Sequence, residues 1–550
     1  MSASSRTDRI FGSLIGLIGF FIVVNPRVLN PTDVRWLLWG DSATHYLGWE
    51  FFRKTPIFQW PIGANPHFGQ GFGESIVYSD SIPLVAIPLK YVSLLLPDTF
   101  QYLGWWILTC FVMQGVTAFA LIRFTGVSRI RAGVGTTALV LFPPFLYRLI
   151  HDGYGHMALA SHWLVLLSML MFVSRESRIS RWTFVATIAL LVQPYLAVFP
   201  ISLGLWRMVR DRPTLLITSL GVTVARVLVL GGVPISVFWA LGGFPSGSSG
   251  DTGFGVYQST LTSLLDPSPT YSFSWSRILQ AMDFDYPAGT NEGFSFIGTG
   301  LILLIPVAIA VLLRRRRLPH GDWVGLLAVG TSLACISLLP SVRLGGRTLF
   351  TVAVPDRLLD VAAIFRSNGR FMWLFAYSIA ILVFALVASL PGRLTFLVFG
   401  LCLLIIGAID GVSALQETRE RFSDSAELLI GERHESTWDR IMAGRKHLVT
   451  IPPLNNDPQW IDMALLAKKN GMTTTAAYLG RLNEGRFQAV LNEGEDVVRS
   501  QKFKVDTVYI IMNYPPHPLA DALRRQGSTR AAGTTFRAER VENLLVIHAD

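Results

Sequence analysis

The chain has 550 residues, of which 51% are hydrophobic and only 15% are charged. Soluble globular proteins carry about 25% charged residues, so this composition, with its repeated apolar runs, excludes an ordinary soluble enzyme and predicts a polytopic membrane protein. The formal net charge is +10. Lysine and arginine cluster between the apolar runs, as in cytoplasmic loops, so the charge does not indicate nucleic-acid binding.

The first apolar run, residues 10–25, could pass for a signal peptide, but no small-residue cleavage site follows it, and we expect an uncleaved helix. Residues 182–208 contain "LLVQPYLAVFP", which predicts a break between two short helices, with one long kinked helix as the alternative. Residues 82–97 are short and rich in proline, so we expect an interfacial or partly inserted helix. About eleven crossings are predicted: 10–25, 101–124, 133–149, 158–174, 182–194, 196–208, 214–240, 295–313, 322–339, 371–390 and 394–411.

Charge selects the orientation. With the N-terminus inside, every loop predicted to be cytoplasmic is basic, as the positive-inside rule requires. These loops are 125–132, 175–181, 209–213, 314–321 and 391–393. The same orientation places three long loops and the tail outside: 26–100, 241–294, 340–370 and 412–550.

The tail, residues 412–550, has a higher density of charged residues and shorter apolar runs than the rest of the chain. "DTVYIIMN" and "VENLLVIHAD" are typical of buried strands, and "PLADALRRQG" predicts a short helix ending at Gly527. The sequence therefore predicts a mainly α fold: a transmembrane helical bundle, residues 1–411, followed by a small extracytoplasmic α/β domain, residues 412–550.

The first external loop opens with "WLLWGDSATHYLGWEFFR", an aromatic stretch that contains Asp41 and His45. An acid at the outer end of a membrane helix could be a general base or a metal ligand. The alternative is that Asp41 caps a helix beginning at Ser42, because aspartate is a favoured N-cap. The pattern alone leaves both interpretations open.

Two more acids follow in "GESIVYSDSIPL", where Asp80 could again be a helix cap. Glu74 and Asp80 could together bind a cation or position an acceptor hydroxyl. Their spacing selects no particular metal, so a divalent cation is the one cofactor that the sequence leaves open.

Histidines cluster in "LIHDGYGHMALASH", at the outer end of the third and fourth predicted crossings. His156 and His162 are not spaced for one helix face, so a zinc pair is not expected. We predict that His151 and His156 line a polar cavity, with interfacial anchoring as the alternative. Glu292, in "NEGFSFIG", is a further acid in a loop with a composition suited to sugar binding.

Two arginines, Arg366 and Arg370, stand in "IFRSNGRFMW" on the predicted outer side of a crossing. A positive-inside protein avoids external arginines, so these predict an anion there, either a lipid headgroup or a lipid-linked phosphate.

The arrangement of an inward-to-outward first helix, an acid-bearing first loop, many crossings and an external tail resembles the GT-C class of membrane glycosyltransferases. "GDSATHYLGWEFFR", "WPIGANPHFG" and "SIVYSDSIPL", with "NEGFSFIG" and "FRSNGRF", resemble an uncharacterised bacterial family within that class. The last two pieces are also similar to a YfhO-like group. The resemblance implies a bacterial inner-membrane enzyme.

This resemblance implies inverting sugar transfer from a polyprenyl-phosphate donor to a glycan, lipid or protein acceptor. It gives Asp41 the role of catalytic base, or of positioning the acceptor hydroxyl, and Arg366 and Arg370 that of binding the donor phosphate. The GT-C pattern often pairs two acids, whereas Gly40 and Ser42 flank Asp41 here, which weakens the case for a metal-bound pair. We expect His45, Glu74, Asp80, His151, His156 and Glu292 to line the acceptor pocket. A flippase of lipid-linked glycans and a non-catalytic assembly factor are the alternatives.

Overall fold

The chain divides into two compact units in the computed structural model. The first comprises Met1–Asn30, Tyr102–Ser236 and Asp251–Asp424, and the second Pro31–Gln101, Val237–Gly250 and Ser425–Asp550. The division of the chain into domains 1–411 and 412–550 stays a prediction. The structure describes residues 5–149, 155–211, 220–244, 254–268, 274–280, 289–355, 365–423, 435–455, 457, 459–512, 528–531, 534–542 and 544–550.

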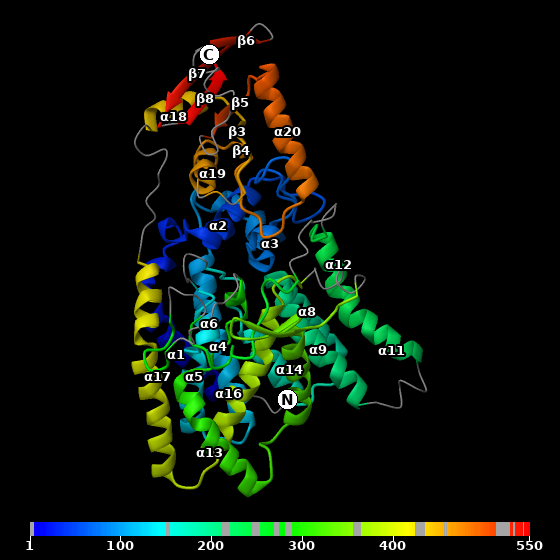
Figure 1. Ribbon diagram of the computed structural model, residues 1–550, viewed down its shortest axis with the longest axis vertical. Helices are drawn as coiled ribbons and strands as arrows, with labels where there is room; N and C mark the ends of the chain where they lie inside the picture. Colours follow the sequence, from blue (N-terminus) through cyan, green and yellow to red (C-terminus); the bar gives the residue numbers. More distant parts are fainter. Residues whose placement is uncertain are drawn as a thin grey trace. The chain divides into compact units, whose positions relative to one another are not determined.

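The first unit is helical, with one small hairpin (Figure 1). Each of the eleven apolar segments contains helix within its described residues. The helices are α1 Arg6–Val23, α4 Leu103–Phe124, α5 Arg129–Val140, α6 Pro143–Leu146, α7 Trp163–Val173, α8 Ile179–Val192, α9 Pro194–Asp211, α11 Leu220–Val227, α12 Val233–Ala240, α13 Thr299–Arg315, α14 Trp323–Ser337, α16 Met372–Ala388 and α17 Arg393–Arg421. The last four residues of α12 belong to the second unit. Short turns η1 Pro26–Leu29, η6 Thr290–Gly293 and η8 Asn368–Phe371, the π-helical turn η5 Leu228–Gly232, and the strands β1 Ser341–Leu344 and β2 Arg347–Thr351 complete the unit.

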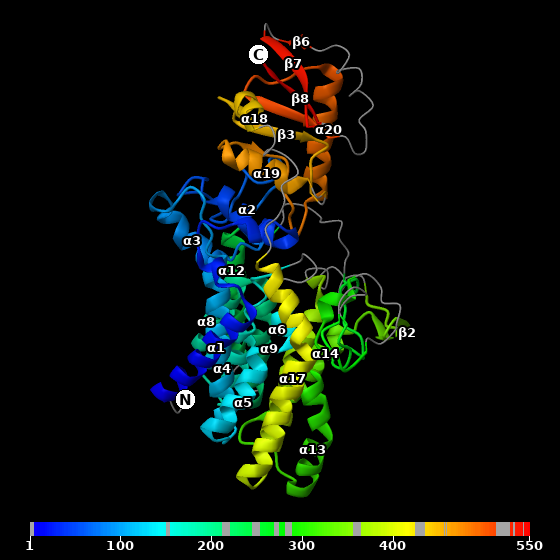
Figure 2. The same cartoon turned by 90° about the vertical axis from the view of Figure 1, so that its left-hand side faces the viewer.

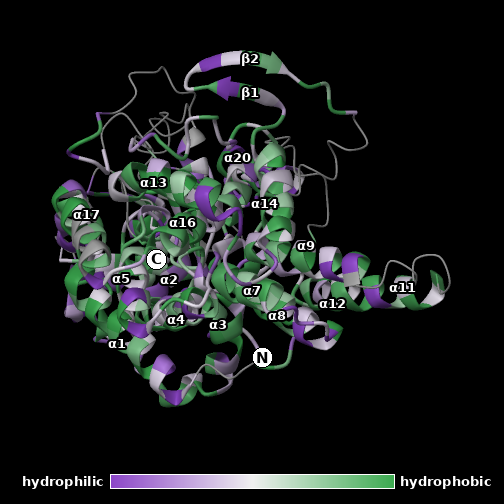
Figure 3. Ribbon diagram, turned by 90° about the horizontal axis from the view of Figure 1, so that it is seen from below, coloured by the Kyte–Doolittle hydropathy of each residue, from purple (hydrophilic) through white to green (hydrophobic). Residues whose placement is uncertain are grey.

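Hydrophobic residues dominate these helices, as Figure 3 shows for α8 and α16. Among the described residues, three helices are both long and apolar enough to cross a membrane: Leu103–Phe124, Leu220–Ala240 and Asn368–Ala388. This finding agrees with a membrane protein. The number of crossings and their orientation stay predictions.

Small residues let α1 and α4 approach closely. Gly12 and Gly16 on α1 face Gly115 and Phe111 on α4, and a Cβ at Gly16 would collide with the backbone of Phe111. A glycine every fourth residue is a common way to bring two membrane helices together, because the backbones then touch without intervening side chains.

The predicted break in residues 182–208 is confirmed. Gln193 is extended, with φ −164°, and separates α8 from α9, which begins at Pro194. Proline disfavours helical geometry in the residue before it, which explains the break. The Gln193 side chain then accepts a hydrogen bond from the backbone N–H of Tyr195 at 2.7 Å.

The second unit contains a six-stranded sheet with helices around it (Figure 2). The strand order is β4-β3-β5-β8-β7-β6, with β3 parallel to β4 and β5, and the other pairs antiparallel. The predicted strands in "DTVYIIMN" and "VENLLVIHAD" are confirmed as β5 and β8, whereas the predicted helix 518–527 lies outside the described residues. The strands are β3 His447–Ile451, β4 Thr473–Thr474, β5 Thr507–Ile511, β6 Ser528–Ala531, β7 Thr534–Val541 and β8 Leu544–Ala549.

The helices of this unit come from both ends of the chain. They are α2 Gly40–Phe52, α3 Pro83–Tyr91, α18 Glu435–Met442, α19 Trp460–Lys469 and α20 Glu484–Ser500, with short turns η2 Arg35–Leu37, η3 Ile76–Ser79 and η4 Ser93–Leu95. The predicted short helix within 82–97 is therefore present as α3, while its place at a membrane interface stays a prediction.

The first loop extends the sheet. Phe68 forms a parallel bridge with Thr474 of β4. The N–H of Gln70 donates to the Thr474 carbonyl at 2.7 Å, and the Thr474 N–H donates to the His67 carbonyl at 3.1 Å. The Phe68 ring also packs against Trp460 of α19 at 5.9 Å. The loop and the C-terminal residues therefore share one folded unit.

Candidate functional site

Asp41 lies in the first turn of α2, one residue after the helix begins at Gly40. Trp39 is the N-cap and makes no side-chain capping bond. The alternative that Asp41 caps a helix starting at Ser42 is therefore wrong: the helix begins two residues earlier, where Gly40, with φ +42°, turns the chain into it. A carboxylate in the first turn is still favoured by the positive end of the helix dipole.

His45 lies one turn further along α2 and is 1% exposed. Its Nδ1 bonds with the backbone carbonyl of Asp41. The Ser81 hydroxyl donates to the His45 carbonyl at 2.8 Å, and Ser81 directly follows Asp80. The segments that carry Asp41 and Asp80 therefore both contact His45, so the structure brings these three predicted residues into one region of the second unit.

Asp80 ends η3 in the left-handed conformation, with φ +50°. Ile82, rather than Asp80, is the N-cap of α3, so the alternative that Asp80 caps this helix is also wrong. Aspartate and asparagine tolerate left-handed backbone better than most residues, because their short polar side chains bond locally. A substitution of Asp80 by asparagine should therefore leave the backbone intact.

Glu74 makes contacts elsewhere in the second unit. Its carboxylate pairs with Arg486 at 3.3 Å and accepts a hydrogen bond from the Asn483 side chain at 3.2 Å. Asn483 also caps α20 through the Arg486 N–H. The contacts of Glu74 thus hold the start of α20 against the first loop.

Glu50, also on α2, is a buried acid that the sequence interpretation did not select. Its Oε1 accepts from Arg53 at 3.3 Å and from the Phe100 N–H at 3.2 Å, and Lys468 of α19 lies 3.6 Å from Oε2. Burial raises the pKa of the Glu50 carboxyl, and Lys468 and Arg53 offset that rise only in part. The sequence does contain a signal that could have identified Glu50: an acid and an arginine stand three residues apart within an aromatic stretch.

In the first unit, Glu292 of η6 joins two arginines. Arg148, after α6, approaches its Oε2 to 2.6 Å and also donates to the Glu292 backbone carbonyl at 2.7 Å. Arg370 of η8 reaches the same oxygen through Nε at 3.0 Å. The two arginine side chains are 4% and 7% exposed. Two guanidinium groups and one carboxylate leave one excess positive charge.

Aromatic rings frame this cluster. Arg148 lies over Tyr147 and Trp373, at 5.1 and 5.0 Å from the ring centroids, and Arg370 lies over Tyr195 at 4.5 Å. Such stacking fixes the plane of a guanidinium and so orients its N–H groups. Arg366, four residues before Arg370, lies over Tyr257 at 5.3 Å.

Glu292 stays charged. Burial alone would raise its pKa, but Arg370 and Arg148, with a smaller contribution from His156, hold the pKa of the carboxyl well below its usual range. His156 is 8% exposed, and its backbone N–H donates to the backbone carbonyl of Arg148 at 3.1 Å. A fixed negative charge holds both arginines in place, and their excess positive charge suits an anion.

The first unit thus brings together Glu292, Arg370 and His156, and adds Arg148, which the sequence interpretation missed. Arg148 precedes the predicted outer loop 150–157, so the reasoning that selected Arg366 applied to it equally. His151 lies outside the described residues. Within the described part of the chain, no group of three or more His, Cys, Asp or Glu side chains could hold a metal ion.

No curated protein matches the chain. Among solved structures it is similar to the Archaeoglobus fulgidus oligosaccharyltransferase tethered with an acceptor peptide, at 10% identity, TM-score 0.40, 93% of this chain and 70% of that one. It is also similar to the archaeal oligosaccharyltransferase AglB from the same organism in complex with an inhibitory peptide and a dolichol-phosphate, at 10% identity, TM-score 0.38, 93% of this chain and 70% of that one.

Two family descriptions match the sequence itself. "Domain of unknown function (DUF6311)" matches residues 13–411, and "DUF6311 C-terminal domain" matches residues 437–533. The YfhO-like resemblance stays a prediction. Because the first match alone spans more than half of the chain, the protein belongs to the DUF6311 family.

Proposed function

We propose that the protein is a membrane glycosyltransferase of the GT-C type, which transfers a sugar from a polyprenyl-phosphate donor to an extracytoplasmic glycan, lipid or protein acceptor. The observation that carries the proposal is the cluster of Arg148, Arg370 and Glu292, with Arg366 four residues away. Ring-stacked arginines with excess positive charge suit a phosphate, which accepts paired hydrogen bonds from a guanidinium.

In this proposal the arginines stabilise the leaving phosphate as the bond from sugar carbon to phosphate oxygen breaks, because that oxygen gains negative charge in the transition state. Glu292 fixes the two arginines through its Oε2 and is given no part in the reaction. The excess of one positive charge remains for the ligand. Asp41 accepts the proton of the acceptor hydroxyl as the new glycosidic bond forms, with inversion at the sugar carbon.

Arg366 is used to test phosphate binding, because it is half-buried and stacks over Tyr257 beside the cluster. Purified full-length protein in neutral detergent is titrated with farnesyl phosphate, and with farnesol as the uncharged control. Arg366→Lys keeps the charge but loses the planar fork, and should weaken farnesyl phosphate binding about tenfold, the value of one charge-assisted hydrogen bond.

Arg347→Lys is the matched control, because Arg347 is exposed on β2 and lies in the same predicted outer loop. It should bind farnesyl phosphate as the unaltered protein does. Equal binding of farnesol and farnesyl phosphate, or equal affinities of the Arg366→Lys and Arg347→Lys proteins, would remove the phosphate role.

The second arm tests Asp41 by sugar transfer in membranes, measured as consumption of the lipid-linked donor. Asp41→Asn removes the proton acceptor and should lower the rate by about 10²–10⁴ at unchanged protein abundance. Asp80→Asn, in the same region, should cause a milder loss. A large loss for Asp80→Asn alone would assign the base to the other carboxylate, and unchanged transfer in both variants would exclude both carboxylates as the base. No donor consumption by the unaltered protein would favour a transporter.

A further inference from the structure

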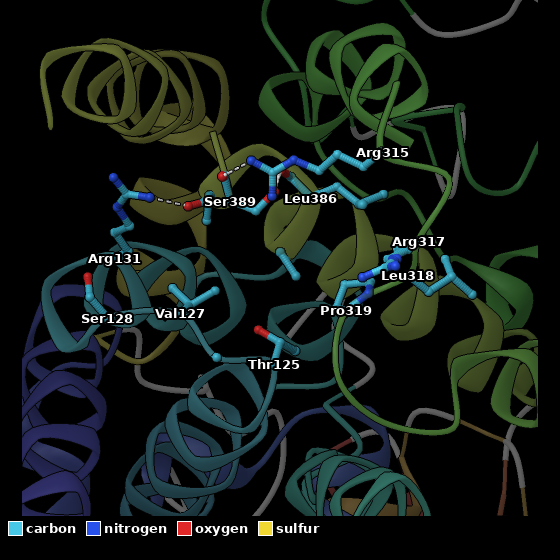
Figure 4. Close-up of a pocket in the computed structure, with 13 residues that line it drawn as sticks. Thr125, Val127, Ser128, Arg131, Arg315, Arg317, Leu318, Pro319, Leu386 and Ser389 are labelled. Atoms are coloured by element: carbon cyan, nitrogen blue, oxygen red, sulfur yellow. Dashed lines mark hydrogen bonds between the residues drawn. The ribbon is translucent and has the colours of Figure 1, made fainter. Parts of the chain in front are cut away.

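A cavity of about 880 Å³ lies in the first unit (Figure 4), and none of its lining residues belongs to the Glu292 cluster. It is formed by the C-terminal ends of α4, α13 and α16 and by the N-terminal end of α5. Its volume is at the upper end of the range for small-molecule sites, about 300–1,000 Å³. It is lined by Thr125, Gly126, Val127, Ser128, Arg131, Arg315, Arg317, Leu318, Pro319, Ala385, Leu386, Ala388 and Ser389.

The charge of this cavity has one sign. Three lining residues are arginines, and none is acidic. Arg131 and Arg315 hold the end of α16: Arg131 donates to the carbonyls of Ala388 and Leu390, and Arg315 donates to the Ser389 carbonyl at 2.6 Å. These bonds neutralise the negative end of that helix, which would otherwise repel an anion.

Arg317, unlike Arg131 and Arg315, does not bond to the end of α16. It is exposed, and within the described part of the chain its guanidinium forms no hydrogen bond or ion pair. An arginine that lines a cavity without a protein partner offers all of its N–H groups to a ligand. Arg317 is therefore the strongest available donor in this cavity.

A helix start adds to the positive potential. Ser128 is the N-cap of α5, a helix of 12 residues, and its side chain makes no capping bond. The first N–H groups of a helix have no partner within the helix, and they bind phosphate groups well. The Ser128 hydroxyl also lines the cavity, so the start of α5 and Arg317 both suit the same kind of ligand.

We propose that this cavity binds the phosphate group of a phosphate ester, contributed either by the headgroup of an anionic lipid or by a soluble phosphorylated metabolite. The site is separate from the proposed donor-phosphate site, because the two share no residue. Arg317 and the start of α5 contact the phosphate, while Arg131 and Arg315 shape the cavity by holding α16.

The test uses the full-length protein in neutral detergent and calorimetric titration with three probes: inorganic phosphate, glycerol 3-phosphate and dihexanoyl phosphatidic acid. At least one probe should bind saturably. Arg317→Gln should weaken that binding about tenfold, as expected for a lost hydrogen bond to a charged group. Much tighter binding of phosphatidic acid than of glycerol 3-phosphate identifies a lipid ligand, and similar affinities identify a soluble ester.

Arg314→Gln is the matched control. Arg314 belongs to the same run of four arginines but does not line the cavity, so its loss should leave the affinity unchanged. Arg317→Glu keeps the same exposed position and should weaken binding further, with an unfolding temperature like that of the unaltered protein. The absence of saturable binding by every probe, or equal losses in Arg314→Gln and Arg317→Gln, would overturn the proposal.

Discussion

Glu292 in the first unit and Glu50 in the second are acids that each contact two cationic side chains, yet their environments shift the pKa in opposite directions. The Glu292 side chain is 19% exposed, and that of Glu50 is 0% exposed. One Glu292 oxygen meets two arginines, at 2.6 and 3.0 Å. Glu50 has one arginine at 3.3 Å on one oxygen and a lysine at 3.6 Å on the other. The pKa of Glu292 is lowered, and that of Glu50 is raised.

The number of neighbouring charges therefore does not decide whether such an acid stays ionised: Glu292 has the shorter ion pairs and the more exposed carboxylate, and both favour its charged form. Charge-assisted bonds of about 3.0 Å or less offset the free-energy cost of removing a carboxylate from water, whereas longer contacts offset it only in part. Glu292 can therefore anchor two arginines at fixed positions. Glu50 gains less from ionisation, because its cationic partners lie further away and its side chain is fully buried.

The largest expected effect comes from removing one partner of Glu292. Arg148→Gln leaves the Glu292 carboxylate enclosed with one arginine, and breaking a buried pair in this way costs about 3–5 kcal/mol of unfolding free energy. Denaturant unfolding of the detergent-solubilised protein measures the loss. Arg421→Gln is the control, since Arg421 forms an exposed pair at 3.7 Å with Glu417 and should cost about 0.5 kcal/mol or less. Similar costs for the two variants would contradict the special role of Arg148.

A smaller effect separates the two acids directly. Glutamine has the shape of a protonated glutamic acid, so Glu50→Gln should change the unfolding free energy by less than about 1 kcal/mol. Glu292→Gln leaves two enclosed arginines without their counter-ion and should cost about 2–3 kcal/mol. The same denaturant titration compares the variants. If Glu50→Gln costs as much as Glu292→Gln, the two environments are equivalent.

The smallest effect is a pH dependence. Because folding raises the pKa of Glu50, the folded state binds its proton more tightly, so stability from this group rises as pH falls toward the ordinary glutamate value. Between pH 7 and 5 the unfolding temperature of the unaltered protein should rise by about 2–4 °C relative to Glu50→Gln. Glu292 adds nothing in that window, because its lowered pKa gives stability that is lost only below the ordinary glutamate value. A parallel response of the unaltered protein and Glu50→Gln would exclude this assignment.

Local patterns predicted what depends on local sequence. The break before Pro194 and the strands β5 and β8 follow from a proline and from short apolar runs, and the structure contains them. The start of α2 was misplaced because Gly40, whose positive φ opens the helix, carries no capping signal in its side chain.

Contacts between distant segments could not be predicted from a single sequence. Arg148 and Glu292 are 144 residues apart, and nothing in the local sequence around either residue identifies the other as its partner. The bridge from Phe68 to Thr474 is equally invisible, because neither residue lies in a long β-like run. Such pairings are decided by the packing of whole elements, which local periodicity does not encode.

The bridge between Phe68 and Thr474 has a consequence for how this family can vary. Phe68 belongs to the stretch matched by the first family description and Thr474 to the stretch matched by the second. Residues 67–70 cover the outer edge of β4, an edge that would otherwise expose unpaired backbone groups and invite aggregation. A chimera that takes its C-terminal domain from one family member must therefore take the matching first loop from the same parent, and a version that exchanges only one of them inherits a sheet with an uncovered border.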